Sequence, residues 1–335
     1  MSVRKPTEVC LTFDTEFSIG GAFADPDNRQ PIGEEWVNCP ADGRDHGLPL
    51  ILDTLSKYGI KATFFVEALN AAYFGDAPMG RVVARILAAG QDVQLHLHPS
   101  WTAFADPDWR TRVAADPPND DCTKLDADHY AGLIAAGLAQ FQRWNAPAPV
   151  ALRTGNLQVN QSTYAAMAST GLKVSSNVGL AVYRPSESVL QLASGRHLVN
   201  GVIEVPVLTY DQLRLGRWRK ERLFTITASS YRESVELLCT ARHVGISPVV
   251  VLSHPFEFIK YRKGSTAFRP NPINQARLQR LCAFISEHPR DFVSQDFRRG
   301  ALEWGAAQQK PSTKIGVSLP AALLRAVENG VNDLL

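Results

Sequence analysis

The chain has 335 residues, of which 45% are hydrophobic and 20% charged, and its net charge is +2. This balance is typical of an ordinary globular protein with a large core, and so small a net charge argues for neither nucleic acid nor a membrane as a partner, so we expect no nucleic-acid partner. No stretch of the sequence reaches the roughly 18 apolar residues that a membrane span needs. We therefore expect no membrane span.

The cysteines and the N-terminus indicate where the protein works. The five cysteines are widely scattered and form no C-x-x-C motif. This pattern suits a reducing compartment and argues against a disulfide scaffold or a zinc knuckle. The first residues, MSVRKPTEV, contain no apolar run of the kind that a signal peptide has. We expect a cytoplasmic protein, and the sequence gives no oligomeric state.

Predicted strands and helices alternate through the first part of the chain. The apolar run ATFFV at 62–66 lacks polar alternation, as expected for a strand that is buried on both faces. Composition and spacing predict strands at 8–14, 62–66 and 92–97, helices at 47–58 and 79–89, and long polar loops at 18–45 and 99–125.

The same alternation continues toward the C-terminus. The predicted helices are 126–144, 162–169, 229–244 and 274–287, and the predicted strands are 150–153, 173–175, 201–208 and 248–253. Such alternation predicts a mainly parallel sheet with right-handed crossovers. About seven units without a clear linker favour a closed or nearly closed barrel over two open sheets. Active sites of α/β barrels lie at the C-terminal ends of the strands, so polar residues there are the candidates.

The first strand ends in two acids. Side chains of a strand alternate between faces, so Asp14 points to the same side as Glu16 if the strand continues that far. Two carboxylates this close need a cation between them, or a proton on one of them.

The third strand ends in two histidines. The same alternation places His96 and His98 on one face, within reach of a single metal ion. Imidazole with carboxylate is a common ligand set for zinc and for other first-row divalent metals. His96 is the firmer ligand, since His98 has an alternative role in contacting substrate.

Two further strand ends carry a histidine and an arginine. His254 follows the apolar strand 248–253, where it is placed to protonate a leaving amine, and Arg153 ends the strand 150–153. A guanidinium beside a carboxylate holds that carboxylate ionised and oriented. Together with Asp14 as base and a metal site, these are the parts that metal-assisted attack of water on an amide or ester carbonyl requires.

From about Glu8 to Asp296, the chain resembles a polysaccharide deacetylase with NodB homology, a member of carbohydrate esterase family four. The segments that carry the resemblance occur in the family's order: TFD at 12–14, KATFFV at 61–66, the His96/His98 strand end, LRTG at 152–155 and LSHP at 252–255. The resemblance implies a single-domain α/β fold, a distorted (β/α)7 TIM-like barrel, over residues 1–305. Residues 306–335 then form a C-terminal tail with an amphipathic helix.

The resemblance also implies roles for individual residues. Asp14 is the expected general base, His254 the general acid, and Arg153 the residue that braces Asp14. The common family motif has a second, metal-binding aspartate where this chain has Thr15, so the ligand role passes to Glu16. The two histidines lie two residues apart here, against four in the common motif. The most similar form is the WalW-type branch, which is linked to surface-polysaccharide biosynthesis.

The expected reaction is hydrolysis of a linear, non-peptide amide: removal of an acetyl group from an N-acetylated amino sugar, a glycoconjugate or a surface-polysaccharide precursor. Zinc is the first expectation for the metal, with cobalt, manganese, iron and nickel also compatible. Trp101 is a candidate for stacking on a sugar ring, although loop tryptophans also often cover a core. Asn156 is a candidate for contacting substrate at the mouth of the barrel.

Three other functions fit parts of the pattern. The same barrel is suited to hydrolysing another C–N bond in a small cytosolic metabolite. A degenerate barrel that binds a saccharide or a partner protein without turnover would explain the loss of the second aspartate. A glycoside hydrolase using Asp14 and Glu204 is the third alternative, and it leaves the three histidines without a role.

Overall fold

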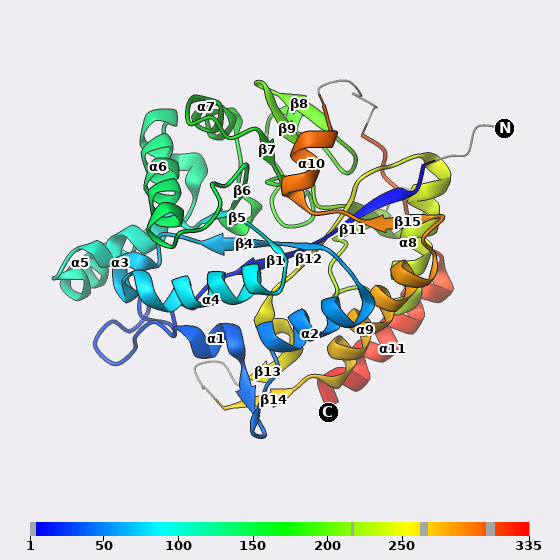
Figure 1. Ribbon diagram of the computed structural model, residues 1–335, viewed down its shortest axis with the longest axis horizontal. Coiled ribbons are helices and arrows are strands. Elements are labelled where there is room, and N and C mark those ends of the chain that lie inside the picture. Colours follow the sequence, from blue (N-terminus) through cyan, green and yellow to red (C-terminus); the bar gives the residue numbers. More distant parts are fainter. Residues whose placement is uncertain (1–4, 216–217, 262–266, 306–311, 335) are drawn as a thin grey trace.

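A curled sheet of mainly parallel strands forms the centre of the protein (Figure 1). The computed structural model describes residues 5–215, 218–261, 267–305 and 312–334. The strands of the sheet are β1 (Thr7–Thr15), β4 (Ala62–Glu67), β5 (Asp92–Leu97), β6 (Ala151–Thr154), β7 (Val174–Ser175), β8 (His197–Val199), β9 (Val202–Glu204), β12 (Val249–Ser253) and β15 (Phe292–Ser294). In space they follow the order β12-β1-β4-β5-β6-β7-β9-β8, with β15 beside the start of β1. Neighbours run parallel except β8 and β9, as the alternation of strands and helices predicts.

The sheet nearly closes on itself. Val207, which follows β9, bridges Val250 of β12 in parallel, and the Leu208 amide donates to the Val250 carbonyl at 3.2 Å. Thr225 bridges Leu252 in the same way. The prediction of a single-domain α/β barrel of the distorted (β/α)7 type is therefore confirmed.

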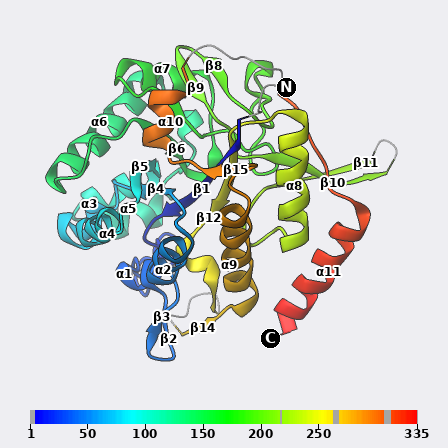
Figure 2. The same cartoon turned by 45° about the vertical axis from the view of Figure 1, so that its right-hand side comes forward.

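Helices cover the outside of the sheet (Figures 1 and 2). The longer helices are α2 (Leu48–Tyr58), α4 (Asp76–Ala88), α6 (Ala127–Arg143), α7 (Gln161–Ser169), α8 (Tyr231–Val244), α9 (Pro272–Glu287) and α11 (Leu319–Leu334). The shorter ones are α1 (Glu34–Asn38), α3 (Ala71–Phe74), α5 (Trp109–Ala115) and α10 (Phe297–Glu303). Local sequence sets several ends: α8 begins at a capping box between Ser230 and Glu233 and ends at Gly245, whose φ is 83°.

Short elements occupy the loops between these helices and strands. The short 3₁₀ helices are η1 (Pro99–Ala105), η2 (Cys122–Lys124), η3 (Gly155–Leu157), η4 (Ser188–Leu190) and η5 (Pro255–Phe258). Three small hairpins pair β2 (Pro40–Ala41) with β3 (Arg44–Asp45), β10 (Thr209–Leu215) with β11 (Trp218–Leu223), and β13 (Ile259–Tyr261) with β14 (Phe268–Pro270). The predicted strand 201–208 is regular only in β9, because Pro206 has no amide hydrogen for the ladder.

The two faces of β1 lie in two different cores. Val9, Leu11 and Phe13 pack between the sheet and the outer helices. Cys10 lies on the inner face, in a second core that fills the barrel and includes Phe297 of α10. Because side chains alternate along a strand, the inner row of β1 ends at its C-terminal end in Asp14, at the mouth of the barrel.

The described helices include none with the length and apolar character of a membrane-crossing segment.

Candidate active site

Glu16, His96 and His98 come together at the mouth of the barrel. Glu16 follows β1, His96 lies in β5 and His98 just after it. Glu16 Oε2 lies 2.9 Å from His98 Nε2 and 3.6 Å from His96 Nε2. One ligand atom from each residue lies within 4.8 Å of the others. Two imidazoles and one carboxylate are the three protein ligands of many catalytic metal sites, in which the remaining position stays open.

In both histidines Nδ1 contacts another residue, and Nε2 is the nitrogen that faces Glu16. His96 Nδ1 lies 2.9 Å from the carbonyl oxygen of Arg153, and His98 Nδ1 lies 2.5 Å from Asp120 Oδ2. A carbonyl oxygen only accepts, so His96 Nδ1 carries a proton, and neutral His96 leaves its Nε2 lone pair directed at Glu16. Metal-ligating histidines usually make such hydrogen bonds through the other ring nitrogen. The residues present therefore fit a divalent metal ion.

The electrostatics of the cluster also favour a cation. Burial opposes charge on both Glu16 and His98. Their contact nevertheless lowers the pKa of Glu16 well below its usual range and raises the pKa of His98 well above its usual range. A positive charge beside Glu16 is thus stabilised, whether a proton or a metal ion supplies it.

Asp120 is a member of the site that sequence reasoning missed. Besides its contact with His98, its Oδ1 accepts a hydrogen bond from the Ser100 amide at 3.1 Å, and its Oδ2 accepts one from Asn156 Nδ2 at 3.0 Å. The residue lies in the long polar loop before α6, where many aspartates face solvent. Nothing in that stretch distinguishes Asp120 from its neighbour Asp121.

Glu67, the last residue of β4, is a second acid that sequence reasoning missed. Its side chain is buried and accepts hydrogen bonds from the amides of Leu69 at 2.6 Å and His98 at 2.5 Å. Burial raises the pKa of Glu67 to about 8. The carboxyl group fixes the backbone that carries His98. One feature of the sequence could have identified it: in KATFFVE an acid is the last residue of an otherwise mainly apolar strand.

Arg153 and Asp14 form a buried ion pair inside the barrel. Arg153 Nη1 donates to Asp14 Oδ1 at 2.7 Å and to Thr12 Oγ1 at 2.9 Å. The other guanidinium nitrogens donate to Ser176, and the group lies 4.2 Å from the centre of the Phe65 ring. Arg153 therefore hydrogen-bonds to one carboxylate oxygen of Asp14, Oδ1, and leaves the other oxygen, Oδ2, without a bond from the arginine.

His254 faces that second oxygen. Its Nε2 lies 3.9 Å from Asp14 Oδ2, and its Nδ1 lies 3.3 Å from Glu257 Oε1. Glu257 Oε2 accepts hydrogen bonds from Ser253 Oγ at 2.7 Å and from the His254 amide at 3.1 Å. Burial alone lowers the pKa of His254, but the carboxylates of Glu257 and Asp14 raise it to about 9. Sequence reasoning missed Glu257, although it lies only three residues beyond the histidine.

Two residues do not take the roles considered for them. Trp101 is 1% exposed and packs against Phe104 and Phe74, with ring centres 5.3 and 6.0 Å away. Neither face of its ring is free for a sugar, so the stacking role is corrected to one in the core. Glu204 is buried and accepts hydrogen bonds from Tyr164 and from two backbone amides, so it is not available as the partner of Asp14.

Asn156, by contrast, is exposed at the mouth of the barrel. Its backbone is in the left-handed region, with φ 54°, which asparagine tolerates better than most residues. The side chain is anchored on Asp120 and thereby lies next to His98.

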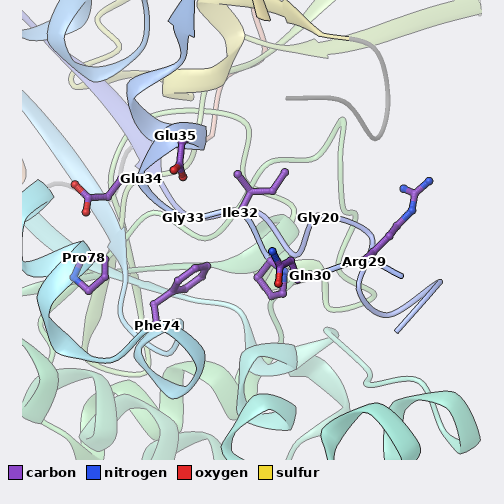
Figure 3. Close-up of a pocket in the computed structure, with 10 residues that line it drawn as sticks. Gly20, Arg29, Gln30, Ile32, Gly33, Glu34, Glu35, Phe74 and Pro78 are labelled. Carbon is purple, nitrogen blue, oxygen red and sulfur yellow. The ribbon is translucent and has the colours of Figure 1, made fainter. Parts of the chain in front are cut away.

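A separate hollow of about 660 Å³ lies between the loop after β1 and the segment of α3 and α4 (Figure 3). Arg29, Gln30, Ile32 and Phe74 are among its lining residues, and none of the acids or histidines described above is. Phe74 connects the two regions, because it packs edge-on against Phe17 at 4.9 Å, directly after Glu16.

No protein-family model matches the sequence, and no curated protein sequence matches it. Solved structures do resemble it. A protein from Mycobacterium smegmatis described as a polysaccharide deacetylase is 16% identical, with a TM-score of 0.58, over 95% of this chain and 98% of that one. A family 4 carbohydrate esterase from Streptomyces lividans is 14% identical, with a TM-score of 0.42, over 87% and 93% of the two chains. The peptidoglycan deacetylase PdaC from Bacillus subtilis is 11% identical, with a TM-score of 0.38, over 100% and 98%. The first of these likenesses supports the fold.

Proposed function

We propose that this chain is a metal-dependent hydrolase that removes an acetyl group from an N-acetylated amino sugar or glycoconjugate. The observation that carries the proposal is the convergence of Glu16, His96 and His98 at the same mouth as Asp14 and His254. The fold shared with the Mycobacterium smegmatis protein described as a polysaccharide deacetylase supports the substrate class. Membership of carbohydrate esterase family four, and of its WalW-type branch, is part of the proposal. The branch rests on the acid-x-acid and His-x-His spacings.

In this proposal Glu16, His96 and His98 hold the metal, with zinc the first choice and cobalt, manganese, iron or nickel as alternatives. When bound, such an ion polarises a carbonyl and lowers the pKa of water. Asp120 keeps the His98 ring oriented, and the Arg153 carbonyl does the same for His96.

Asp14 and His254 carry the proton transfers. Arg153 holds Asp14 in place through Oδ1, so that the free Oδ2 takes a proton from the attacking water. With its pKa raised to about 9, His254 is protonated at neutral pH and donates to the leaving nitrogen. The water oxygen bonds to the acetyl carbon, the C–N bond breaks, and the products are acetate and a free amine.

The polar mouth suits a hydroxyl-rich substrate. Asn156 is exposed there beside His98 and Asp120, so we assign it to contacts with the sugar. We further assign the catalytic domain to residues 1–305. The unpaired cysteines favour action in the cytoplasm, on a sugar or a surface-polysaccharide precursor.

The test begins with protein purified without a histidine tag, stripped with a chelator and reloaded with zinc or cobalt. Metal content is measured by mass spectrometry, and acetate release from acetylated glucosamine oligomers is measured in parallel. The wild-type chain should bind about one metal ion and release acetate. Glu16→Ala and His96→Ala should lose both properties, whereas His254→Ala should keep the metal and lose acetate release.

Two results would contradict the proposal. A wild-type chain that takes up neither zinc nor cobalt, nor manganese, iron or nickel when these are offered, contradicts the metal-dependent mechanism. Release of ammonia or of a new reducing end without acetate would indicate hydrolysis of a different bond.

A further inference from the structure

The C-terminal helix α11 turns its large apolar residues away from the barrel. Figure 2 shows the helix along the rim of the molecule, beside α8 and α9. Within the part of α11 whose side chains the structure describes, every exposed residue is uncharged. The large ones and their exposed fractions are Leu319 (55%), Leu323 (60%), Leu324 (42%), Val327 (63%) and Val331 (46%). A surface helix normally has the opposite arrangement, with its polar side facing solvent.

Three polar residues of α11, namely Arg325, Glu328 and Asn329, point toward α8 and α9 and are paired there. Arg325 is 5% exposed, and its Nε lies 3.2 Å from Oε1 of the buried Glu233 on α8. Glu328 lies 2.9 Å from Nη2 of Arg277 on α9, and Asn329 accepts a hydrogen bond from the same nitrogen at 2.8 Å. Rolling the helix to bury its leucines would leave Glu233 of α8 and Arg277 of α9 buried without these partners. The outward position of the apolar residues is therefore built into the fold.

The chemistry of this face favours an apolar partner over a lipid or nucleic-acid surface. Helices that lie on membranes combine an apolar side with exposed lysines and arginines, and nucleic-acid sites also need exposed cations. Arg325 of α11 is buried in an ion pair with Glu233 and is not exposed on this face. The exposed residues Leu319, Leu323, Val327 and Val331 recur every four residues, which forms the kind of ridge that fits the groove of a second helix.

We propose that this ridge is a homodimer interface, in which α11 of a second copy of the chain packs against it about a twofold axis. A twofold contact brings the same surface together with itself, and an uncharged surface does so without repulsion between like charges. The five large residues expose on the order of 400 Å² per copy, about half of what each partner of a standard interface buries. The neighbouring surface must supply the rest, so we expect a dimer that dissociates on dilution. The inference does not depend on the proposed reaction.

The test is sedimentation velocity of the full chain at concentrations from micromolar upward. The wild type should shift from monomer to dimer, and Leu323→Glu and Val327→Glu should each weaken the dimer about tenfold or more. Leu302→Glu is the matched control, because Leu302 lies on α10, away from the ridge, and is 85% exposed. It should leave the dimer unchanged. An equimolar mixture of Val327→Lys and Val327→Glu should contain more dimer than either variant alone, which also shows that both variants are folded.

Three outcomes would overturn the inference. They are a wild-type monomer at every concentration, a dimer that the α11 variants do not weaken, and a monomer that instead co-sediments with phosphatidylcholine vesicles.

Discussion

The two halves of the candidate site are held in different ways. Asp14 and Arg153 lie within strands β1 and β6, and their buried ion pair belongs to the inner wall of the barrel. Glu16, His98 and Asp120 lie in segments outside the strands, and hydrogen bonds between these segments hold them. The buried charges within the strands therefore contribute to the stability of the fold, whereas the charges in the segments outside the strands are free to bind a metal ion. Variants of the first half should destabilise the protein, and variants of the second should weaken metal binding.

The largest effect on folding is expected for Arg153→Met. The change leaves Asp14 buried without its partner, and breaking a buried ion pair in this way lowers the free energy of unfolding by about 3–5 kcal/mol. Urea denaturation measures it. Arg81→Met is the control, because the Arg81–Glu34 pair is largely exposed and worth about 1 kcal/mol or less. Equal effects of the two changes would remove the distinction between the halves.

Glu16→Gln should leave folding intact and remove metal binding. A neutral amide replaces the carboxylate that both imidazoles face, so we expect the affinity for zinc or cobalt to fall by more than the ~100-fold seen for residues behind a ligand. Isothermal titration calorimetry measures the affinity, and urea denaturation checks the fold. Unchanged affinity would place the metal elsewhere.

Asp120→Asn should have a smaller effect of the same kind. Loss of the carboxylate behind His98 frees the ring orientation and should cost about 10–100-fold in metal affinity. Asp121→Asn is the matched control, since Asp121 caps η2 and makes none of the described contacts with His98. If both changes act alike, Asp120 does not position the histidine.

Glu257→Gln tests, through the pH dependence of the rate, how His254 beside the buried Asp14 is kept protonated. His254 must be protonated to donate, so the rate should hold below pH 9 and fall above it, because the pKa of His254 is about 9. Without the charge of Glu257 that pKa drops toward the ordinary value of about 6.5, and the alkaline fall moves to lower pH. A pH–rate profile of acetate release measures the shift. The exposed Glu287→Gln should leave the profile in place, and an unmoved profile in Glu257→Gln would remove this role for Glu257.

The sequence by itself determined the features that depend on short-range periodicity. Alternation along a strand is enough to place Asp14 with Glu16 and His96 with His98, since it depends only on the geometry of consecutive residues. The alternation of strands and helices likewise predicts a parallel sheet that curls into a barrel. The mainly apolar run at 62–66 identifies β4 because a strand covered on both sides is built mostly of apolar residues.

Only the tertiary structure decided which distant groups meet those residues. Asp120 and Glu67 reach His98 from other segments: Asp120 from a loop without periodicity, and Glu67 from the end of the neighbouring strand β4. The burial of Trp101 depends on aromatic neighbours that the local pattern does not place. The exposed apolar ridge of α11 could not be predicted from the sequence either. An amphipathic pattern shows that a helix has an apolar and a polar face, but not which of them the protein buries. Contacts with α8 and α9 decide the orientation, because Arg325 and Glu328 pair with charged residues of those helices while the large apolar residues of α11 stay exposed.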